Sequence, residues 1–170
     1  MLLLPVSRPP HKDVTLEPGP EVRLELCRAA VAGDERLGVC ELEVERGGVS
    51  YSVATLRELH EREPEDELTF IVGADMAETL PAWREPRELL RLAQVAVAER
   101  GESRRAGIAQ RIAELEPGDR VRYFDMPGIE ISSTMLRARA ARGEALRYLT
   151  TDAVAREVAE RGLYAGGEAA

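Results

Sequence analysis

Short aliphatic runs that alternate with amphipathic stretches constrain the fold of this 170-residue chain more than any other feature. The runs are mostly apolar, as expected of parallel strands that are covered on both faces. The stretches between them place apolar residues three or four positions apart, which predicts helices. We therefore expect an α/β fold with a mainly parallel sheet. The runs interpreted as buried strands are Met1–Val6, Leu68–Val72, Val95–Ala98 and Val121–Phe124.

One further strand and six helices complete the predicted pattern. Apolar and polar residues alternate loosely over Arg36–Val44, which favours a strand. Ser50 or Ser52 is a plausible N-cap for the helix that follows the Gly47–Gly48 turn. Helices are predicted over Glu21–Ala32, Val53–Glu63, Pro86–Ala93, Ile108–Leu115, Leu136–Arg142 and Thr151–Arg161.

Composition narrows the classes of function that the chain can have. We expect one domain over residues 1–165 with a disordered tail over 166–170, and an aliphatic core, since aromatics make up only 4% of the residues. A net charge of −8 argues against a general nucleic-acid surface, although a small anion can still respond to a local field. Cys27 and Cys40 lack paired spacing, and Leu2–Leu4 is too short to span a membrane. These features predict a cytoplasmic protein.

A run of hydroxyl residues at a predicted helix start is the strongest candidate site. Ser132, Ser133 and Thr134 stand where the first backbone N–H groups have no intrahelical partner and the helix dipole is positive. Arg137 follows Ser133 by four residues and therefore lies on the same side of the helix. Together they predict a phosphate site. The alternative is an ordinary N-cap beside a solvated arginine.

Three other segments contain candidate ligand contacts whose role the local sequence does not decide. Asp75 comes two residues after Gly73, which ends a predicted buried strand. This places it at the carboxyl edge of a parallel sheet, where ligands bind. The alternative is that Asp75 only caps the next helix. Trp83 is the sole tryptophan and could stack on a flat ring or fill the core. His11 and Lys12 follow two prolines in a loop, and are either cationic ligand contacts or solvated side chains. His60 is interpreted as an ordinary helix-surface residue.

Taken together, these stretches resemble the bacterial nicotinate-nucleotide adenylyltransferases of the nucleotidyltransferase α/β-phosphodiesterase superfamily, which have a Rossmann-like fold. The resemblance runs from Leu3 to Tyr164. Each motif is weak alone, but their order and spacing are specific. The motifs are Leu4-Pro5 to Pro10-His11-Lys12, Ser50-Tyr51-Ser52 to Thr55-Leu56, Phe70 to Asp75, Leu80 to Trp83, Ile131 to Arg137 and Gly162-Leu163-Tyr164.

The resemblance implies an activity and its substrates. Enzymes of this kind transfer the AMP moiety of ATP to nicotinate mononucleotide, giving deamido-NAD and pyrophosphate in NAD biosynthesis. The mononucleotide phosphate attacks the α-phosphorus in line, with Mg²⁺ carried by the ATP phosphates and no protein metal site. Membrane and nucleic-acid partners are not implied.

The resemblance also implies roles for individual residues. ATP phosphates would be held by the hydroxyl run with Arg137 and by Lys12, with His11 as a further candidate beside it. Adenosine would contact Gly73 and Asp75 through its ribose, and Ile131 would border the adenine. Trp83 would stack on the pyridine ring, while Ser52 or Thr55 would help bind the carboxylate. Ser52 stands where the family usually has threonine.

The sequence departs from the family at one important place. The family opens with a strand, a turn and a His-x-Gly-His motif whose histidines stabilise the transition state, and neither His11 nor His60 sits in such a motif. No catalytic residue is therefore assigned in this chain. We expect the sequence to be a truncated version of an intact enzyme that lacks on the order of thirty residues, the size of a βαβ unit, and to be inactive as written. Two alternatives stay open: another small-molecule adenylyltransferase, such as one acting on pantetheine phosphate, and a non-catalytic nucleotide-binding module.

Overall fold

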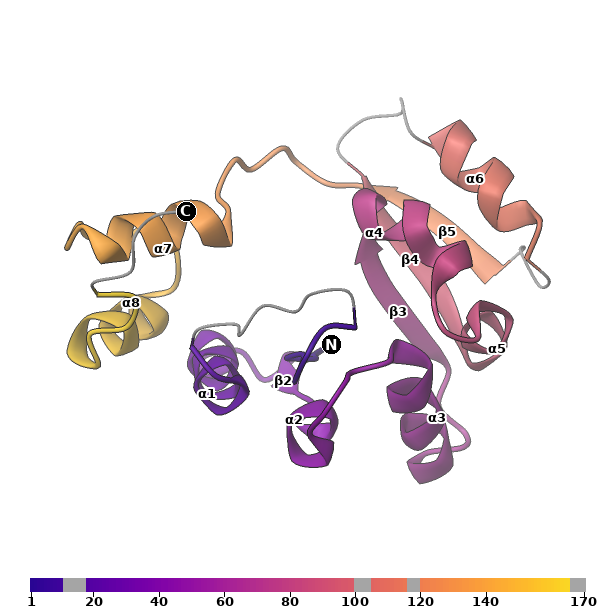
Figure 1. Cartoon of the computed structure of the whole chain (residues 1–170), viewed down its shortest axis with the longest axis horizontal. Helices are drawn as coiled ribbons and strands as arrows, with labels where there is room; N and C mark the ends of the chain where they lie inside the picture. Colours follow the sequence, from indigo (N-terminus) through magenta and orange to yellow (C-terminus); the bar gives the residue numbers. More distant parts are fainter. Residues whose placement is uncertain (11–17, 100–104, 116–119, 166–170) are drawn as a thin grey trace. The chain divides into compact units, whose positions relative to one another are not determined.

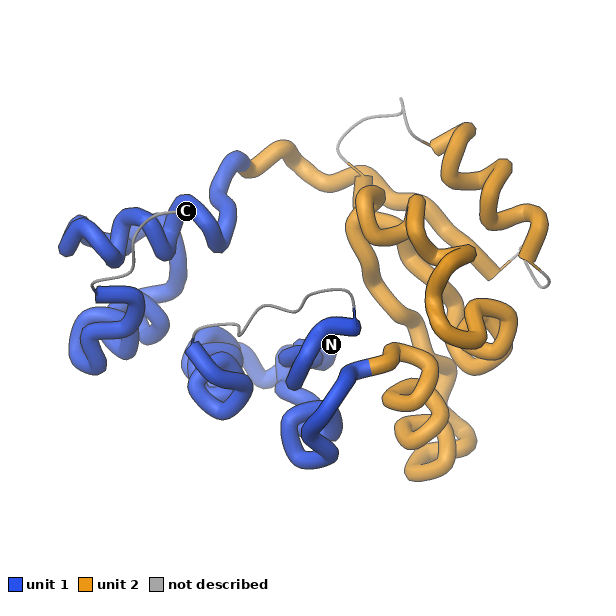
Figure 2. The backbone as a smooth tube through the Cα atoms, viewed as in Figure 1, with its two compact units in different colours: residues 1–50, 130–170 blue, residues 51–129 orange. Residues whose placement is uncertain are grey.

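The computed structural model describes residues 1–10, 18–99, 105–115 and 120–165 (Figure 1). The chain forms two compact units (Figure 2). Unit 1 comprises residues 1–50 and 130–170, and unit 2 comprises residues 51–129. His11, Lys12 and the tail 166–170 lie outside the described residues.

Unit 2 is built on a parallel sheet of three strands in the order β3-β4-β5. Strands β3 (Leu68–Gly73), β4 (Ala93–Glu99) and β5 (Val121–Asp125) fall where the sequence predicts strands. Gly73 pairs with Ala98, which pairs with Phe124, so the carboxyl ends of the three strands lie at one edge. This is the edge at which parallel α/β sheets bind ligands.

Helices connect the strands of unit 2 and close its core. The helices are α3 (Ser52–Arg62), α4 (Ala74–Thr79), the 3₁₀ turn η1 (Leu80–Ala82), α5 (Pro86–Leu92) and α6 (Arg105–Ala113). The α4 helix packs on β3 and β4, and α5 packs on β4 and α3. Alternate residues of β4 are buried beneath these helices, as a strand period of two requires. The core is aliphatic, with Leu80, Leu89, Leu90, Val95 and Val97 fully buried.

Unit 1 contains a two-stranded parallel ladder and four helices within its described residues. Strand β1 (Leu2–Leu3) pairs with β2 (Gly38–Val39). The helices are α1 (Pro20–Val31), α2 (Leu42–Arg46), α7 (Ser133–Ala141) and α8 (Asp152–Glu160). Helices α1 and α8 pack together, and Glu25 of α1 forms an ion pair with Arg161 just after α8. These contacts join the first and last parts of the chain in one unit.

Three local predictions are wrong. The strand expected over Met1–Val6 is limited to Leu2–Leu3, and Leu2 is 50% exposed rather than buried. The strand expected over Arg36–Val44 is limited to Gly38–Val39, and its last residues belong instead to helix α2, which buries Leu42. Neither Ser50 nor Ser52 caps α3, because the N-cap is Tyr51 and the Ser50 hydroxyl accepts a hydrogen bond from the Ser7 backbone N–H at 3.0 Å. The α/β class with parallel strands is confirmed.

Candidate nucleotide-binding site

Helix α7 begins at the hydroxyl run that the sequence singles out. Ser132 has an extended backbone, and its Oγ accepts a hydrogen bond from the Met135 N–H at 3.1 Å, so it is the N-cap. Ser133 and Thr134 are the first two residues of the helix, and both are exposed. Helix capping therefore explains the presence of Ser132. The next two residues present hydroxyl and N–H groups at the helix start, where an anion is favoured.

Positive charge lies beside this end of α7. Exposed Arg137 donates a long hydrogen bond, 3.4 Å, to the Thr134 hydroxyl. Arg137 and Arg23 both act on the phenol of Tyr164: burial raises the Tyr164 pKa, and the two guanidinium charges oppose that rise. Two arginines thus contribute to the field in this part of unit 1, and Arg23 was not among the predicted residues.

Arg23 also fixes the chain on either side of residues 11–17. Its guanidinium donates to the carbonyls of Val6 at 2.6 Å and Ser7 at 3.0 Å, and its Nε donates to Pro18 at 3.3 Å. A planar guanidinium with several donors suits such a role better than an ammonium does. Spacing alone gives no signal for this contact, since its partners are backbone groups.

The end of β3 in unit 2 carries the residues predicted to contact adenosine. Gly73 is the last residue of β3, and Asp75 lies exposed in the first turn of α4. The Asp75 carboxylate lies back over Gly73, because a Cβ at position 73 would stand 2.7 Å from Oδ1. The N-cap of α4 is Gly73, and no side chain forms a capping hydrogen bond at this helix start. Asp75 therefore does not act as the cap of α4. Ile131, in unit 1, is 37% exposed.

Trp83 lies on the rim of the unit 2 core rather than inside it. Its ring is partly buried and meets Phe70 edge to face, with the ring centroids 6.2 Å apart and an interplanar angle of 76°. Its indole Nε1–H donates to the Thr79 hydroxyl at 2.9 Å. Both the N–H and the ring of this tryptophan are therefore held in place while part of the side chain remains open to solvent.

The two hydroxyl candidates on α3 differ in accessibility. Ser52 is the first residue of α3 and is half-buried, whereas Thr55 is 1% exposed and belongs to the interior of unit 2. A ligand carboxylate can reach a half-buried residue at a helix start more readily than a fully buried one. His60, on the same helix, is exposed as predicted.

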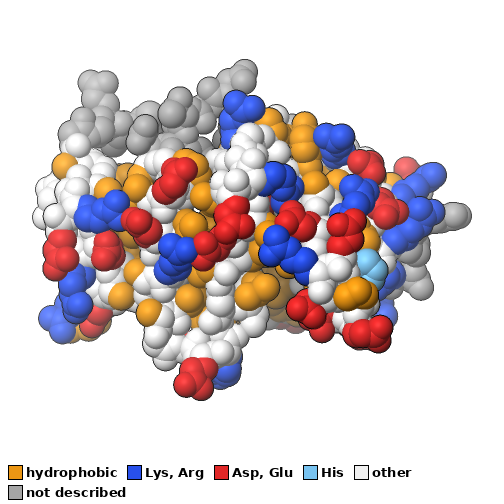
Figure 3. Space-filling view, turned by 90° about the horizontal axis from the view of Figure 1, so that it is seen from below, with side chains coloured by type: hydrophobic (Ala, Val, Ile, Leu, Met, Phe, Trp, Pro, Cys, Tyr) orange, Lys and Arg blue, Asp and Glu red, His pale blue; other side chains and the backbone are white. Residues whose placement is uncertain are grey.

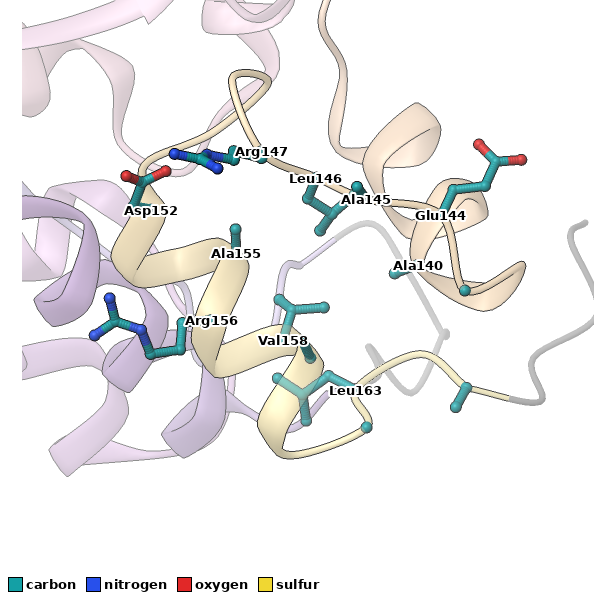
Figure 4. Close-up of a pocket in the computed structure, with 14 residues that line it drawn as sticks. Ala140, Glu144, Ala145, Leu146, Arg147, Asp152, Ala155, Arg156, Val158 and Leu163 are labelled. Carbon is teal, nitrogen blue, oxygen red and sulfur yellow. The ribbon is translucent and has the colours of Figure 1, made fainter.

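A cavity of about 690 Å³ in unit 1 is separate from these residues (Figure 4). Its walls come from the end of α7, the following loop and α8, and include Glu144, Arg147, Asp152 and Arg156. None of the residues that the sequence predicts as ligand contacts is among those that line it. The cavity is therefore distinct from the predicted phosphate site at the start of α7.

Surface charge is interspersed rather than gathered by sign on the face shown in Figure 3. Ion pairs such as Arg28–Glu41, Arg57–Glu85 and Arg62–Glu58 join side chains that are at least partly exposed. Among the described residues, no group of three or more His, Cys, Asp and Glu side chains could hold a metal ion. No helix in the described ranges is long and apolar enough to cross a membrane.

Comparisons with known proteins identify the family of the chain. A family model described as cytidylyltransferase-like matches residues 1–139, which with the parallel α/β fold defines the chain as a nucleotidyltransferase of Rossmann-like architecture. Proteins described as probable nicotinate-nucleotide adenylyltransferases match nearly all of it. One from Shouchella clausii is 37% identical over 95% of this chain and 79% of its own length, and one from Exiguobacterium sibiricum is 40% identical over 95% and 81%. The chain belongs to the nicotinate-nucleotide adenylyltransferase family.

Solved structures support the fold independently. The nicotinic acid mononucleotide adenylyltransferase of Plasmodium falciparum, complexed with NaAD, superposes with a TM-score of 0.71 over 96% of this chain and 81% of that chain. The same enzyme complexed with APC gives a TM-score of 0.53 over 69% of this chain and 59% of that chain. The sequence identities are 14% and 16%, so these likenesses establish the fold alone.

Proposed function

We propose that the chain binds ATP and nicotinate mononucleotide for transfer of AMP to the mononucleotide, in the biosynthesis of NAD. In this reaction a phosphate oxygen of the mononucleotide bonds to the α-phosphorus, and the bond from that phosphorus to the bridging oxygen of pyrophosphate breaks. The observation that carries the proposal is the exposed start of α7, with its hydroxyl run and Arg137, in a chain about 37% identical to a described nicotinate-nucleotide adenylyltransferase.

The ATP contacts follow from the local chemistry of two segments. Ser132, Ser133, Thr134 and Arg137 would hold phosphates at the start of α7, where the helix dipole and the guanidinium both favour negative charge. Gly73 and Asp75 would contact the ribose, since a carboxylate accepts hydrogen bonds from hydroxyls. Ile131 would border the adenine, and Lys12 and His11 would meet the phosphates.

The pyridine nucleotide contacts are proposed for unit 2. Trp83 would stack on the pyridine ring, and Ser52 is favoured over Thr55 for the carboxylate because it is more accessible. Mg²⁺ would enter with the phosphates of ATP and neutralise their charge. Both cysteines are free thiols, as expected in the reducing cytoplasm, where we propose that the protein works.

Positioning and charge neutralisation are the tasks that the assigned residues can perform. No His-x-Gly-His motif occurs in the 170 residues, so the sharp test of the assigned roles is binding rather than turnover. Trp83 is the sole tryptophan, so its fluorescence would report on a mononucleotide stacked against it. Nicotinate mononucleotide should change Trp83 emission in a saturable way. Its amide and pantetheine phosphate serve as competitors, and stronger binding of pantetheine phosphate would overturn the assigned substrate.

A further inference from the structure

The Trp83 indole is hydrogen-bonded to a threonine hydroxyl of the preceding helix. Thr79 is the last residue of α4, and Trp83 directly follows η1, so one turn of 3₁₀ helix separates them. Trp83 Nε1–H donates to Thr79 Oγ1 at 2.9 Å, a normal hydrogen-bond length. The bond fixes the direction in which the edge of the indole points.

The hydroxyl has a defined donor and acceptor arrangement. Thr79 Oγ1 donates its own proton to the backbone carbonyl of Met76 at 2.9 Å. A hydroxyl has a single proton, so toward Trp83 this oxygen can act only as an acceptor. The carbonyl belongs to α4, and Ala77 and Leu80 anchor this segment with side chains that are fully buried. The indole N–H is thereby connected through two hydrogen bonds to the rigid core of unit 2.

Phe70 supplies a second restraint from β3. The two rings meet at an interplanar angle of 76°, and such a T-shaped contact can cover at most one face of the indole. Trp83 remains only partly buried. A ring held by its N–H and by one edge-to-face contact is set in position before any ligand binds, which reduces the ordering cost of stacking.

We propose that Thr79 is a positioning residue that orients Trp83 for stacking on the pyridine ring of the mononucleotide. The proposal rests on the proposed function, because it takes the pyridine ring as the group that Trp83 meets. Thr79 itself need not touch the ligand. Its effect on affinity acts through the indole, and this distinguishes it from a direct contact.

The matched variants are Thr79→Val and Thr79→Ser. Valine keeps the branched shape and a similar helix propensity but removes the hydroxyl, whereas serine keeps the hydroxyl. The readouts are the time-resolved fluorescence anisotropy of the sole tryptophan in the ligand-free chain, and the Kd for nicotinate mononucleotide from its emission. Thermal melting of each variant checks folding, and Thr79 is exposed, so neither change should lower the melting temperature markedly.

We expect T79V to show faster and wider local rotation of the indole and a Kd raised about three- to tenfold, the size of one lost hydrogen bond. We expect T79S to restore both readouts to near the wild-type values. Unchanged anisotropy or an unchanged Kd in T79V would overturn the positioning role. If the wild-type chain itself gives no emission change with the mononucleotide, the proposed function fails, and the anisotropy of the free variants still reports separately on the bond between Thr79 and Trp83.

Discussion

The guanidinium of Arg105 holds the buried carboxylate of Glu99 at the carboxyl end of β4, with Nε and Oε2 2.7 Å apart. The same guanidinium pairs with Asp125 at the end of β5. Glu99 and Asp125 are partners in the register of the sheet, so one side chain of α6 joins the ends of two neighbouring strands. The edge that they form also carries Gly73, one of the residues proposed to contact ATP.

Replacing Arg105 should destabilise unit 2 more than an ordinary surface change does. Arg105→Met removes the charge that offsets a carboxylate only 2% exposed, and we expect the free energy of unfolding to fall by about 2 to 3 kcal/mol. Arg111→Met, an exposed position on the same helix, is the control and should cost less than about 0.5 kcal/mol. Urea unfolding measures both, and equal losses would contradict the role given to Arg105.

Replacing Tyr123 by phenylalanine should not lower the stability of the protein. Its hydroxyl is buried without a hydrogen-bond partner in the described part of the chain, so Tyr123→Phe should leave stability unchanged or raise it by about 1 kcal/mol near neutral pH.

The stability difference between Tyr123→Phe and the wild type should depend on pH. Burial, and then the charge of Glu99, raises the Tyr123 pKa above its usual value of 10.0. An unfolded tyrosine therefore ionises at lower pH than the folded one, and the wild type loses stability as the pH rises from about 10 through the folded pKa. Phenylalanine has no such loss, so the advantage of Y123F should grow between about pH 8 and about pH 10.5. Urea unfolding of both proteins at the two pH values checks this, and a stability difference between variant and wild type that does not grow with pH would contradict it.

Ser132 allows helix capping to be separated from phosphate binding. Ser132→Ala removes the acceptor of the Met135 N–H and should cost about 1 kcal/mol of stability. Ser132→Asp keeps a good N-cap and should retain stability, but its negative charge should raise the Kd for ATP at least about tenfold. Calorimetric titration with ATP and thermal melting provide the two readouts. Undiminished ATP binding by a stable S132D would remove the phosphate site from this end of α7.

Arg137 can be compared with an arginine of the neighbouring cavity. Arg137→Met should raise the Kd for ATP about tenfold, the effect of losing one charge-assisted hydrogen bond. Arg156→Met, on α8 and in the cavity wall, is matched in charge and exposure and should bind ATP like the wild type. The reverse result would assign the phosphates to the cavity instead.

Regular periodicity predicted the helices well. The closing helix expected over Thr151–Arg161 is α8 at Asp152–Glu160, capped by the Thr151 hydroxyl. Helices are local structures whose start and stop signals lie in the sequence itself. The strand predicted through Val44 failed because Leu42 and Val44 are spaced as in a strand but belong to a helix of five residues. Apolar spacing over so short a stretch does not distinguish the two.

The candidate residues were found from the sequence more readily than the groups that position them. The start of α7 was predicted because hydroxyl side chains mark helix starts. The bond from Trp83 to Thr79 depends on the break between α4 and η1, and the Glu99–Arg105–Asp125 group depends on the register of the sheet. Such contacts arise only when the chain has folded, so no local pattern reports them.

The proposed function requires this chain to bind both a pyridine mononucleotide and an adenylate. Isothermal titration calorimetry with the dinucleotide NaAD, compared with nicotinate mononucleotide and with AMP, tests it most directly. Since the dinucleotide carries both halves on one molecule, we expect its Kd to be at least about tenfold below that of either mononucleotide. A dinucleotide that binds no more tightly than nicotinate mononucleotide alone would contradict the account.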